Sequence, residues 1–158
     1  GTIALTKQRM DVQEILYDVA QRYESAAQER GLSIRLNVAD PFPEVYGNPD
    51  RTEQVLIILL DNAIKHGSAD EPLALGAEIS GDKVLVHVSN AGTIAEEDIA
   101  HLFERFYKAD RSHSGEGTGL GLSIAQEIMS LLDEKIWAQN RNGRVEFTFT
   151  LSLNAEKV

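Results

Sequence analysis

Residues 115–122 read G-E-G-T-G-L-G-L and place four glycines within seven positions, directly ahead of a helical pattern. Glycine reaches left-handed dihedrals at little steric cost and lets main-chain N–H groups approach a ligand closely. The apolar residues that follow recur at helical spacing: Leu120, Ile124, Ile128 and Leu131. Because the first turn of a helix offers unpaired donors and a partial positive charge, this stretch favours phosphate as its ligand.

A flexible surface loop is the alternative interpretation of a single glycine run. Two common phosphate-binding motifs are excluded by inspection. No Lys follows the glycines, as a P-loop would require. The spacing is G-x-G-x-G, and it follows the polar residues 108–114 rather than a strand, so the dinucleotide-binding fingerprint is absent as well.

Composition limits the classes of function. The chain has 158 residues, of which 42% are apolar and 25% charged, as is typical of one globular domain with its own core. It has no cysteine, so disulfides and thiolate metal sites are excluded. The longest run of large apolar residues, 55–60, is too short to span a bilayer. Since the net charge is −10, we expect no nucleic-acid partner and no direct membrane contact, and local donors must hold any anionic ligand.

Hydrophobic periodicity predicts a domain of mixed helices and strands. Helical spacing predicts helices over residues 11–30, 49–66, 96–106 and 119–132. Alternating and β-rich runs predict strands over residues 32–38, 73–79, 83–88, 135–139 and 145–153. We expect residues 1–10 to be a connector from an upstream segment, residues 11–153 to be the domain, and residues 154–158 to be a C-terminal tail.

The second predicted helix ends in an unusual way for a core helix. Its apolar run is followed by Asn62, Lys65 and His66, which stand at i, i+3 and i+4. Residues at this spacing share one helix face and can converge on a single ligand. The alternative is a solvated helix end with cations near its negative pole.

Three separated stretches resemble the motifs of sensor histidine kinases. D-N-A-I-K at residues 61–65, F-E-R-F-Y at 103–107 and G-T-G-L-G-L at 117–122 stand in the order and spacing of the asparagine box, phenylalanine box and second glycine box. The resemblance covers nearly the whole chain. The resemblance implies the ATP-binding catalytic domain of a two-component sensor kinase, in the superfamily of gyrase, Hsp90, histidine kinases and MutL. The implied Bergerat fold is α+β, a two-layer α/β sandwich with helices on one face of a mixed sheet of about five strands.

The resemblance also implies roles for single residues. Asn62 would supply an amide oxygen to Mg²⁺, a hard cation that takes other ligands from phosphates and water. Catalytic roles fall to Asn62, Lys65 and Arg105. The implied contacts to ATP are Asn62, Lys65, His66, Asn90, Gly92, Ile94, Phe106, Tyr107, Lys108, Arg111, Gly117, Thr118, Gly119, Leu120, Gly121 and Leu122. The polar residues 108–116 would be the ATP lid, which we expect to become ordered when Mg-ATP binds.

The sequence departs from the family pattern at several positions. Residues 90–94 read N-A-G-T-I where the family's first glycine box has D-x-G-x-G, although the oxygen of Asn90 can still accept a hydrogen bond from the amine of adenine. Ile58 stands one turn before Asn62, where many relatives carry a second Asn and related ATPases carry a water-activating Glu. The absence of that Glu favours phosphoryl transfer over hydrolysis. His66 takes a position where the family often has Tyr.

No stretch resembles the phosphoacceptor box, and the histidines His66, His87, His101 and His113 lie in other contexts. We expect His87 to face outward from a strand. The resemblance therefore implies that the partners are dimerisation and phosphoacceptor helices of the same kinase, with a response regulator as an indirect partner. It implies a cytoplasmic domain of a membrane-bound sensor. Two alternatives stay open: a serine kinase of the anti-sigma type, and a nucleotide-binding module without turnover.

Overall fold

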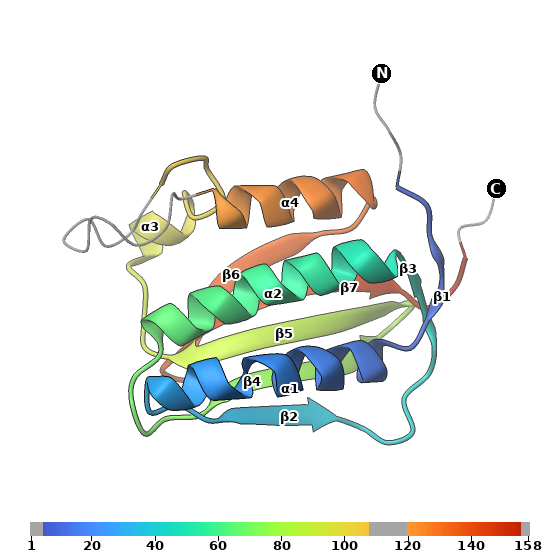
Figure 1. Ribbon diagram of the computed structural model, residues 1–158. Coiled ribbons are helices and arrows are strands. Elements are labelled where there is room, and N and C mark those ends of the chain that lie inside the picture. The colour runs from blue at the N-terminus through green and yellow to red at the C-terminus, as the bar shows by residue number, and fades with distance from the viewer. Residues whose placement is uncertain (1–4, 108–119, 156–158) are drawn as a thin grey trace.

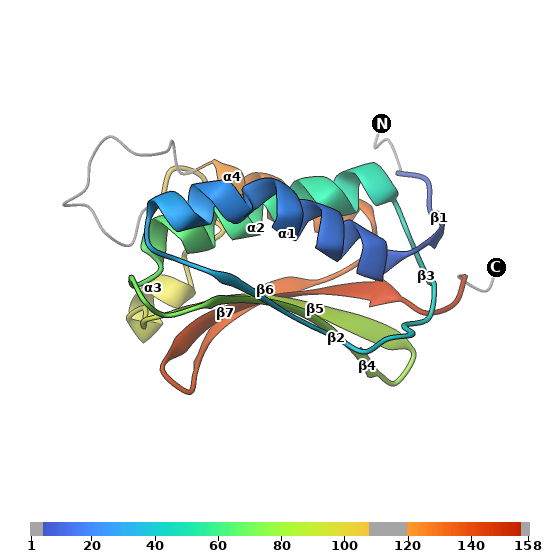
Figure 2. The same ribbon diagram turned by 60° about the horizontal axis from the view of Figure 1, so that its bottom comes forward.

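The computed structural model describes residues 5–107 and 120–155, which form one sheet with helices packed against one face (Figures 1 and 2). The helices are α1 (Val12–Glu29), α2 (Pro49–His66), α3 (Glu96–Ile99) and α4 (Gly121–Leu131). The strands are β1 (Gln8–Met10), β2 (Ile34–Val38), β3 (Val45–Gly47), β4 (Leu73–Ser80), β5 (Lys83–Ala91), β6 (Ile136–Arg141) and β7 (Arg144–Ser152). This arrangement confirms the predicted α+β sandwich.

The sheet has seven strands rather than about five, in the order β1-β3-β7-β5-β4-β2, with β6 also paired to β7. Only the β2–β4 pair is parallel among these strands. The two strands that the sequence did not reveal, β1 and β3, have three residues each, too few to show a period of two. Because β1 pairs with β3, the last residues of the expected connector belong to the sheet.

The two long helices, α1 and α2, pack on the sheet, and each begins at an N-cap residue that the sequence predicts. The carboxylate of Asp11 accepts a hydrogen bond from the N–H of Glu14 at 3.0 Å, and α1 is followed by Gly31 with φ of +74°. The amide oxygen of Asn48 accepts from the N–H of Arg51 at 3.0 Å, and Pro49 opens α2. The buried face of α2 packs against β5, and that of α1 packs against β2 and β4, so that both helices contribute to one core that includes Val86 and Phe149.

The sequence predicts turns at S-G-D, residues 80–82, and at N-R-N-G, residues 140–143, and both hairpins form there. Gly81, with φ of +63°, lies between β4 and β5. Asn142 and Gly143 join β6 to β7 with φ of +53° and +74°. Two successive residues with positive φ form the kind of turn that matches the twist of an antiparallel pair, so this hairpin is short and tightly closed.

The predicted helix over residues 96–106 is wrong beyond its first turn. Helix α3 ends at Ile99, and the chain continues in turns whose hydrogen bonds join residues three apart, as from the N–H of Glu104 to the oxygen of His101. Leu102 is nevertheless buried and Phe103 packs edge-on against Phe147, so the turns use the same apolar residues that suggested a helix. In the described part of the chain, no helix is long and apolar enough to cross a bilayer.

Candidate functional site

Those predicted site residues that the structure describes come from elements that meet at one end of the molecule. The C-terminal end of α2, the end of β5, α3 and the first turn of α4 lie together there (Figure 1). Gly121 lies against α2, because a Cβ added to it would be 3.5 Å from Cγ2 of Ile58. Ile58 precedes Asn62 by one turn of α2, so the start of α4 packs beside the asparagine turn.

The side-chain amide of Asn62, on the last turns of α2, is available to a ligand. Its side chain is half-buried and has no hydrogen-bond partner among residues 5–107 and 120–155. The ammonium of Lys65 lies 3.3 Å from the carboxylate of Asp61 and remains 35% exposed. His66 is exposed at the last position of the helix. An amide oxygen without a partner and a reachable ammonium fit a hard cation with its phosphate ligands.

Asn90 presents a second free acceptor. The residue is 3% exposed, and its amide nitrogen donates to the backbone oxygen of Ala91 at 3.0 Å. The amide oxygen has no hydrogen-bond partner among the described residues, and it is not sealed from solvent. An Asn at this position therefore offers the same acceptor that an Asp would offer to an amine.

The loop after β5 is held in shape by the β6–β7 hairpin. Gly92 has φ of +132°, and its N–H donates to the backbone oxygen of Gly143 at 3.0 Å. The side chain of Asn140 accepts from the N–H of Ile94 at 2.9 Å and donates to its oxygen at 2.7 Å. Asn140 was not predicted as a site residue, because its only signal in the sequence is its place in the predicted turn over residues 140–143.

The phenylalanine-box residues lie in the turns that follow α3. The hydroxyl of Tyr107 donates to the carboxylate of Asp98. Phe106 is 68% exposed and has φ of +65°. Arg105, also exposed, lines a hollow of 1230 Å³ between α4 and β6 together with Leu120.

The remaining predicted contacts divide into two groups. Leu120, Gly121 and Leu122 form the first turn of α4, which no side chain caps. The other contacts, and the whole predicted lid, lie outside the described residues: Lys108, Arg111, Gly117, Thr118 and Gly119. The first turn of α4 is thus the part of the second glycine box whose place in the fold is known, and its N–H groups fit an anion.

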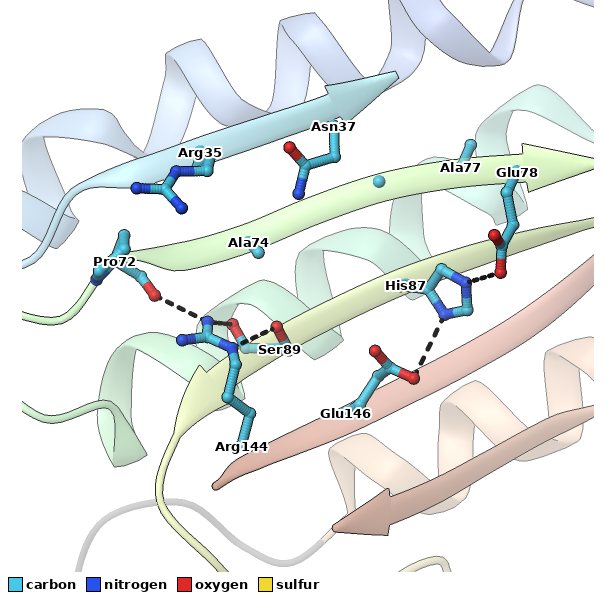
Figure 3. Close-up of a pocket in the computed structure, with 11 residues that line it drawn as sticks. Arg35, Asn37, Pro72, Ala74, Ala77, Glu78, His87, Ser89, Arg144 and Glu146 are labelled. Carbon is cyan, nitrogen blue, oxygen red and sulfur yellow. Dashed lines mark hydrogen bonds and ion pairs between the residues drawn. The ribbon is translucent and has the colours of Figure 1, made fainter. Parts of the chain in front are cut away.

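A second hollow, of about 380 Å³, lies on the face of the sheet that no helix covers. Figure 3 shows Arg35 and Asn37 on one side of β4, with His87, Ser89 and Arg144 on the other. His87 faces outward here, as the alternation of β5 predicted, and its two ring nitrogens lie 2.9 Å from Thr148 Oγ1 and Glu78 Oε1. Because the sheet separates this hollow from α2, it is distinct from the site around Asn62.

A family model shows what kind of domain this is. The family of the "Histidine kinase-, DNA gyrase B-, and HSP90-like ATPase" matches residues 47–155, which include every element around Asn62. The chain belongs to this ATPase family.

Known members of the ATPase family extend the match over most of the chain. The sensor protein VanS of Enterococcus faecium is 29% identical over 152 residues, which are 95% of this chain and 39% of VanS. The sensor histidine kinase YkoH of Bacillus subtilis is 39% identical over 130 residues, which are 80% of this chain and 26% of YkoH. The chain thus spans between about a quarter and two fifths of the length of these relatives.

Solved structures agree with the ATPase fold. The catalytic domain of histidine kinase ThkA, in a nucleotide-free form, has a TM-score of 0.83 and 28% identity, with 94% of this chain and 97% of that one covered. Full-length ShkA in complex with AMPPNP has a TM-score of 0.84 and 27% identity, with 99% of this chain and 33% of that one covered. The chain is therefore homologous to the catalytic domains of sensor histidine kinases.

This ATPase domain has a second polar cluster at the C-terminal end of α4, centred on Glu134. The carboxylate, 1% exposed, accepts hydrogen bonds from Lys83 Nζ at 2.8 Å, Thr150 Oγ1 at 2.7 Å, Ser152 Oγ at 2.7 Å and Lys7 Nζ at 3.4 Å. Burial alone would raise the pKa of Glu134, but the hydrogen bonds from Lys83, Thr150 and Ser152 outweigh it and hold the pKa below its usual value. The cluster joins the α4–β6 turn to β5, β7 and the N-terminal segment.

Proposed function

We propose that this chain is the catalytic domain of a sensor histidine kinase, which binds Mg-ATP and transfers the γ-phosphoryl group to a histidine on a separate dimerisation domain. The observation that carries the proposal is the pair of amide oxygens of Asn62 and Asn90, which have no hydrogen-bond partner among residues 5–107 and 120–155, near a first turn of α4 whose N-cap residue makes no side-chain hydrogen bond. Members of the same family are sensor kinases by name, and one is solved with an ATP analogue.

Each group of the nucleotide has a fitting partner. The oxygen of Asn62 would hold Mg²⁺, which when bound neutralises charge on the phosphates. Lys65 would turn from Asp61 to a phosphate oxygen, because an exposed ion pair at 3.3 Å is weak enough to exchange. Backbone N–H groups at Gly121 would face the phosphates, and the oxygen of Asn90 would accept from the amine of adenine.

The other predicted contacts would complete the pocket. His66 and Ile94 would line the base and sugar, and Arg105 would steady the charge of the transferred group. Further contacts come from the resemblance alone: Phe106, Tyr107, Lys108, Arg111, Gly117, Thr118, Gly119, Leu120 and Leu122.

The acceptor histidine and the remaining partners would lie on other segments. His87 is tied to Glu78 and Thr148 in the sheet, and His101 lies 2.7 Å from Glu104. We place the acceptor on dimerisation helices, a response regulator downstream of them, and the domain itself on the cytoplasmic side of a membrane-bound sensor.

A nucleotide-binding module without turnover is the second candidate. Asn90 favours it, because an uncharged acceptor at the base lowers the strength of the hydrogen bond to adenine. Such a module would bind ATP and leave every acceptor unlabelled.

Incubation with γ-labelled ATP and Mg²⁺ tests the proposal. The chain alone should remain unlabelled, while a sensor-kinase dimerisation domain supplied in trans should gain acid-labile phosphate on its histidine. Label on His66, His87, His101 or His113 would contradict the assignment of the acceptor to another segment. ATP binding without transfer to any acceptor domain would favour the module.

A further inference from the structure

The hollow on the uncovered face of the sheet, here called the sheet-face hollow, has a floor of small residues. Its middle is formed by Ala74 and Gly76 of β4, which lie between longer side chains of β2 and β5. The register places Arg35 on one side of Ala74 and Ser89 on the other. Because the two floor residues have no side chain beyond Cβ, a space of about 380 Å³ remains between the neighbouring strands. This volume lies in the range of small-molecule sites.

Arg144 of β7 lies at one end of the sheet-face hollow and is held there by neutral groups. Its Nε donates to Ser89 Oγ at 3.1 Å, and its Nη2 donates to the backbone oxygens of Pro72 at 2.7 Å and Ser89 at 3.2 Å (Figure 3). Its Nη1 has no hydrogen-bond partner among residues 5–107 and 120–155. Three bonds therefore fix the orientation of the guanidinium, and one of its nitrogens is available to a ligand.

The charge of Arg144 has no carboxylate partner in the described part of the chain. Glu146 lies two residues further along β7 on the same face, but its carboxylate accepts from Gln139 Nε2 at 3.1 Å and lies 3.7 Å from His87 Nδ1. Figure 3 shows this carboxylate turned towards His87 and away from Arg144. Arg144 is half-buried and has lost part of its hydration, so an anion beside it would offset that loss.

A second guanidinium lies on the other side of the floor. Arg35 is exposed and has no partner among the described residues. Figure 3 shows its guanidinium and that of Arg144 at the same end of the sheet-face hollow, the end near Pro72. Since neighbouring strands lie about 4.8 Å apart, β2 and β5 are roughly 10 Å apart with β4 between them. Two cationic groups thus stand on opposite sides of a floor of small residues.

We propose that the sheet-face hollow binds a small molecule with two carboxylates, one held by Arg35 and one by Arg144. A guanidinium is planar, and its parallel N–H groups match the two oxygens of a carboxylate. A short carbon chain between the carboxylates would cross Ala74, where no long side chain blocks it. Two separate negative charges match two cations on different strands better than one compact anion does. The site is independent of the proposed ATP site, because the sheet lies between them.

Titration of the chain with succinate and glutarate, followed by NMR, tests the proposal. The backbone amides of Ala74 and Gly76 report on the floor, and we expect their shifts to saturate with at least one of the two dicarboxylates. Arg35→Gln should raise the dissociation constant at least about tenfold, since charge-assisted hydrogen bonds are lost. Arg9→Gln removes the same charge from an exposed position on β1, at the opposite edge of the sheet, and should leave the dissociation constant unchanged.

Arg144→Lys separates charge from geometry, because it keeps the charge and loses the planar fork. It should also weaken binding, and Arg35→Gln carries the test alone if Arg144→Lys does not fold. The absence of saturable shifts with both dicarboxylates would overturn the proposal, and so would equal losses in Arg35→Gln and Arg9→Gln. Inorganic phosphate or acetate that binds as tightly as the dicarboxylates would show that the hollow responds to charge alone. Shifts confined to Gly121 would place the anion at the proposed nucleotide site instead and contradict the proposal.

Discussion

Polar side chains near the two ends of α4 differ in whether they have hydrogen-bond partners. At its C-terminal end, the buried carboxylate of Glu134 receives hydrogen bonds from four side chains. At its N-terminal end, the amide of Asn62 has no partner among the described residues, and Asn90 keeps one acceptor free. Since buried polar groups in folded proteins are almost always paired, the unpaired end is where a ligand is expected.

This difference separates stability from binding. Satisfied groups around Glu134 hold four segments of the chain together, so changes there should alter the free energy of unfolding. Free acceptors near α2 contribute little to the folded state, because they make no bond that folding would gain. Changes near Glu134 should therefore alter the free energy of unfolding, whereas changes near Asn62 and Asn90 should alter nucleotide binding.

Asn62→Ala should have the largest effect on activity. Loss of the metal ligand should lower phosphoryl transfer to an acceptor domain by at least about 100-fold, because the charge that a metal neutralises is worth several kcal/mol. The free energy of unfolding should change by less than about 0.5 kcal/mol, since the side chain makes no hydrogen bond to residues 5–107 or 120–155. Labelled transfer and denaturant unfolding measure the two quantities.

The control for Asn62 is another amide on the same helix. Gln54 contacts Arg51 and lies about two turns of α2 before Asn62. Gln54→Ala should leave transfer unchanged, whereas Asn62→Asp should retain part of it, because a carboxylate oxygen also binds Mg²⁺. Unfolding of Asn62→Ala, with activity lost only in proportion, would mean that Asn62 is a structural residue.

Glu134→Ala should lower the stability of the domain and leave nucleotide binding unchanged. It leaves the hydroxyls of Thr150 and Ser152 without their acceptor and Lys83 without its carboxylate, with only Ser152 Oγ still accepting from Lys83, so we expect the free energy of unfolding to fall by about 2–4 kcal/mol. Nucleotide affinity of the folded fraction should be preserved. Glu127→Ala, an exposed carboxylate on α4, is the matched control and should change neither quantity. If the Glu134→Ala variant bound nucleotide more weakly under conditions where it is fully folded, the two ends of α4 would not be independent.

A smaller effect of the same cluster should appear in acid. The pKa of Glu134 is lower in the folded than in the unfolded chain, so its stabilisation is fully present above the unfolded pKa of about 4.3 and is lost as pH falls through the folded pKa. The difference in unfolding free energy between wild type and Glu134→Gln should hence be constant above about pH 5 and shrink below about pH 4. A constant difference down to strong acid would show that the charge of Glu134 contributes nothing.

The helices and strands that could be predicted from the sequence are those with a clear local pattern. Helices α1 and α2 have caps next to long apolar stripes, and both were predicted within a residue of their bounds. Strand β3 was missed because three residues carry no period, and α3 was drawn too long because Leu102 is buried by turns instead of a helix.

Residues that act through tertiary contacts left almost no signal. Asn140 resembles any Asn next to a turn, and its role depends on a partner 46 positions away. Glu134 resembles an exposed charge in a helix-ending turn, since Glu is rarely buried. The candidate residues around Asn62 could be proposed from the sequence because three motifs occur together in order, whereas residues such as Asn140 and Glu134 belong to no motif.

Titration of the chain with a non-hydrolysable ATP analogue tests the central claim most directly. We predict saturable binding of one molecule of analogue per chain in the presence of Mg²⁺, weaker binding when Mg²⁺ is removed, and no Mg²⁺ dependence in Asn62→Ala. Calorimetry reports all three without requiring an acceptor domain. A silent titration of the folded wild-type chain, with Mg²⁺ and millimolar analogue present, would contradict the claim that the unpaired end of α4 is a nucleotide site.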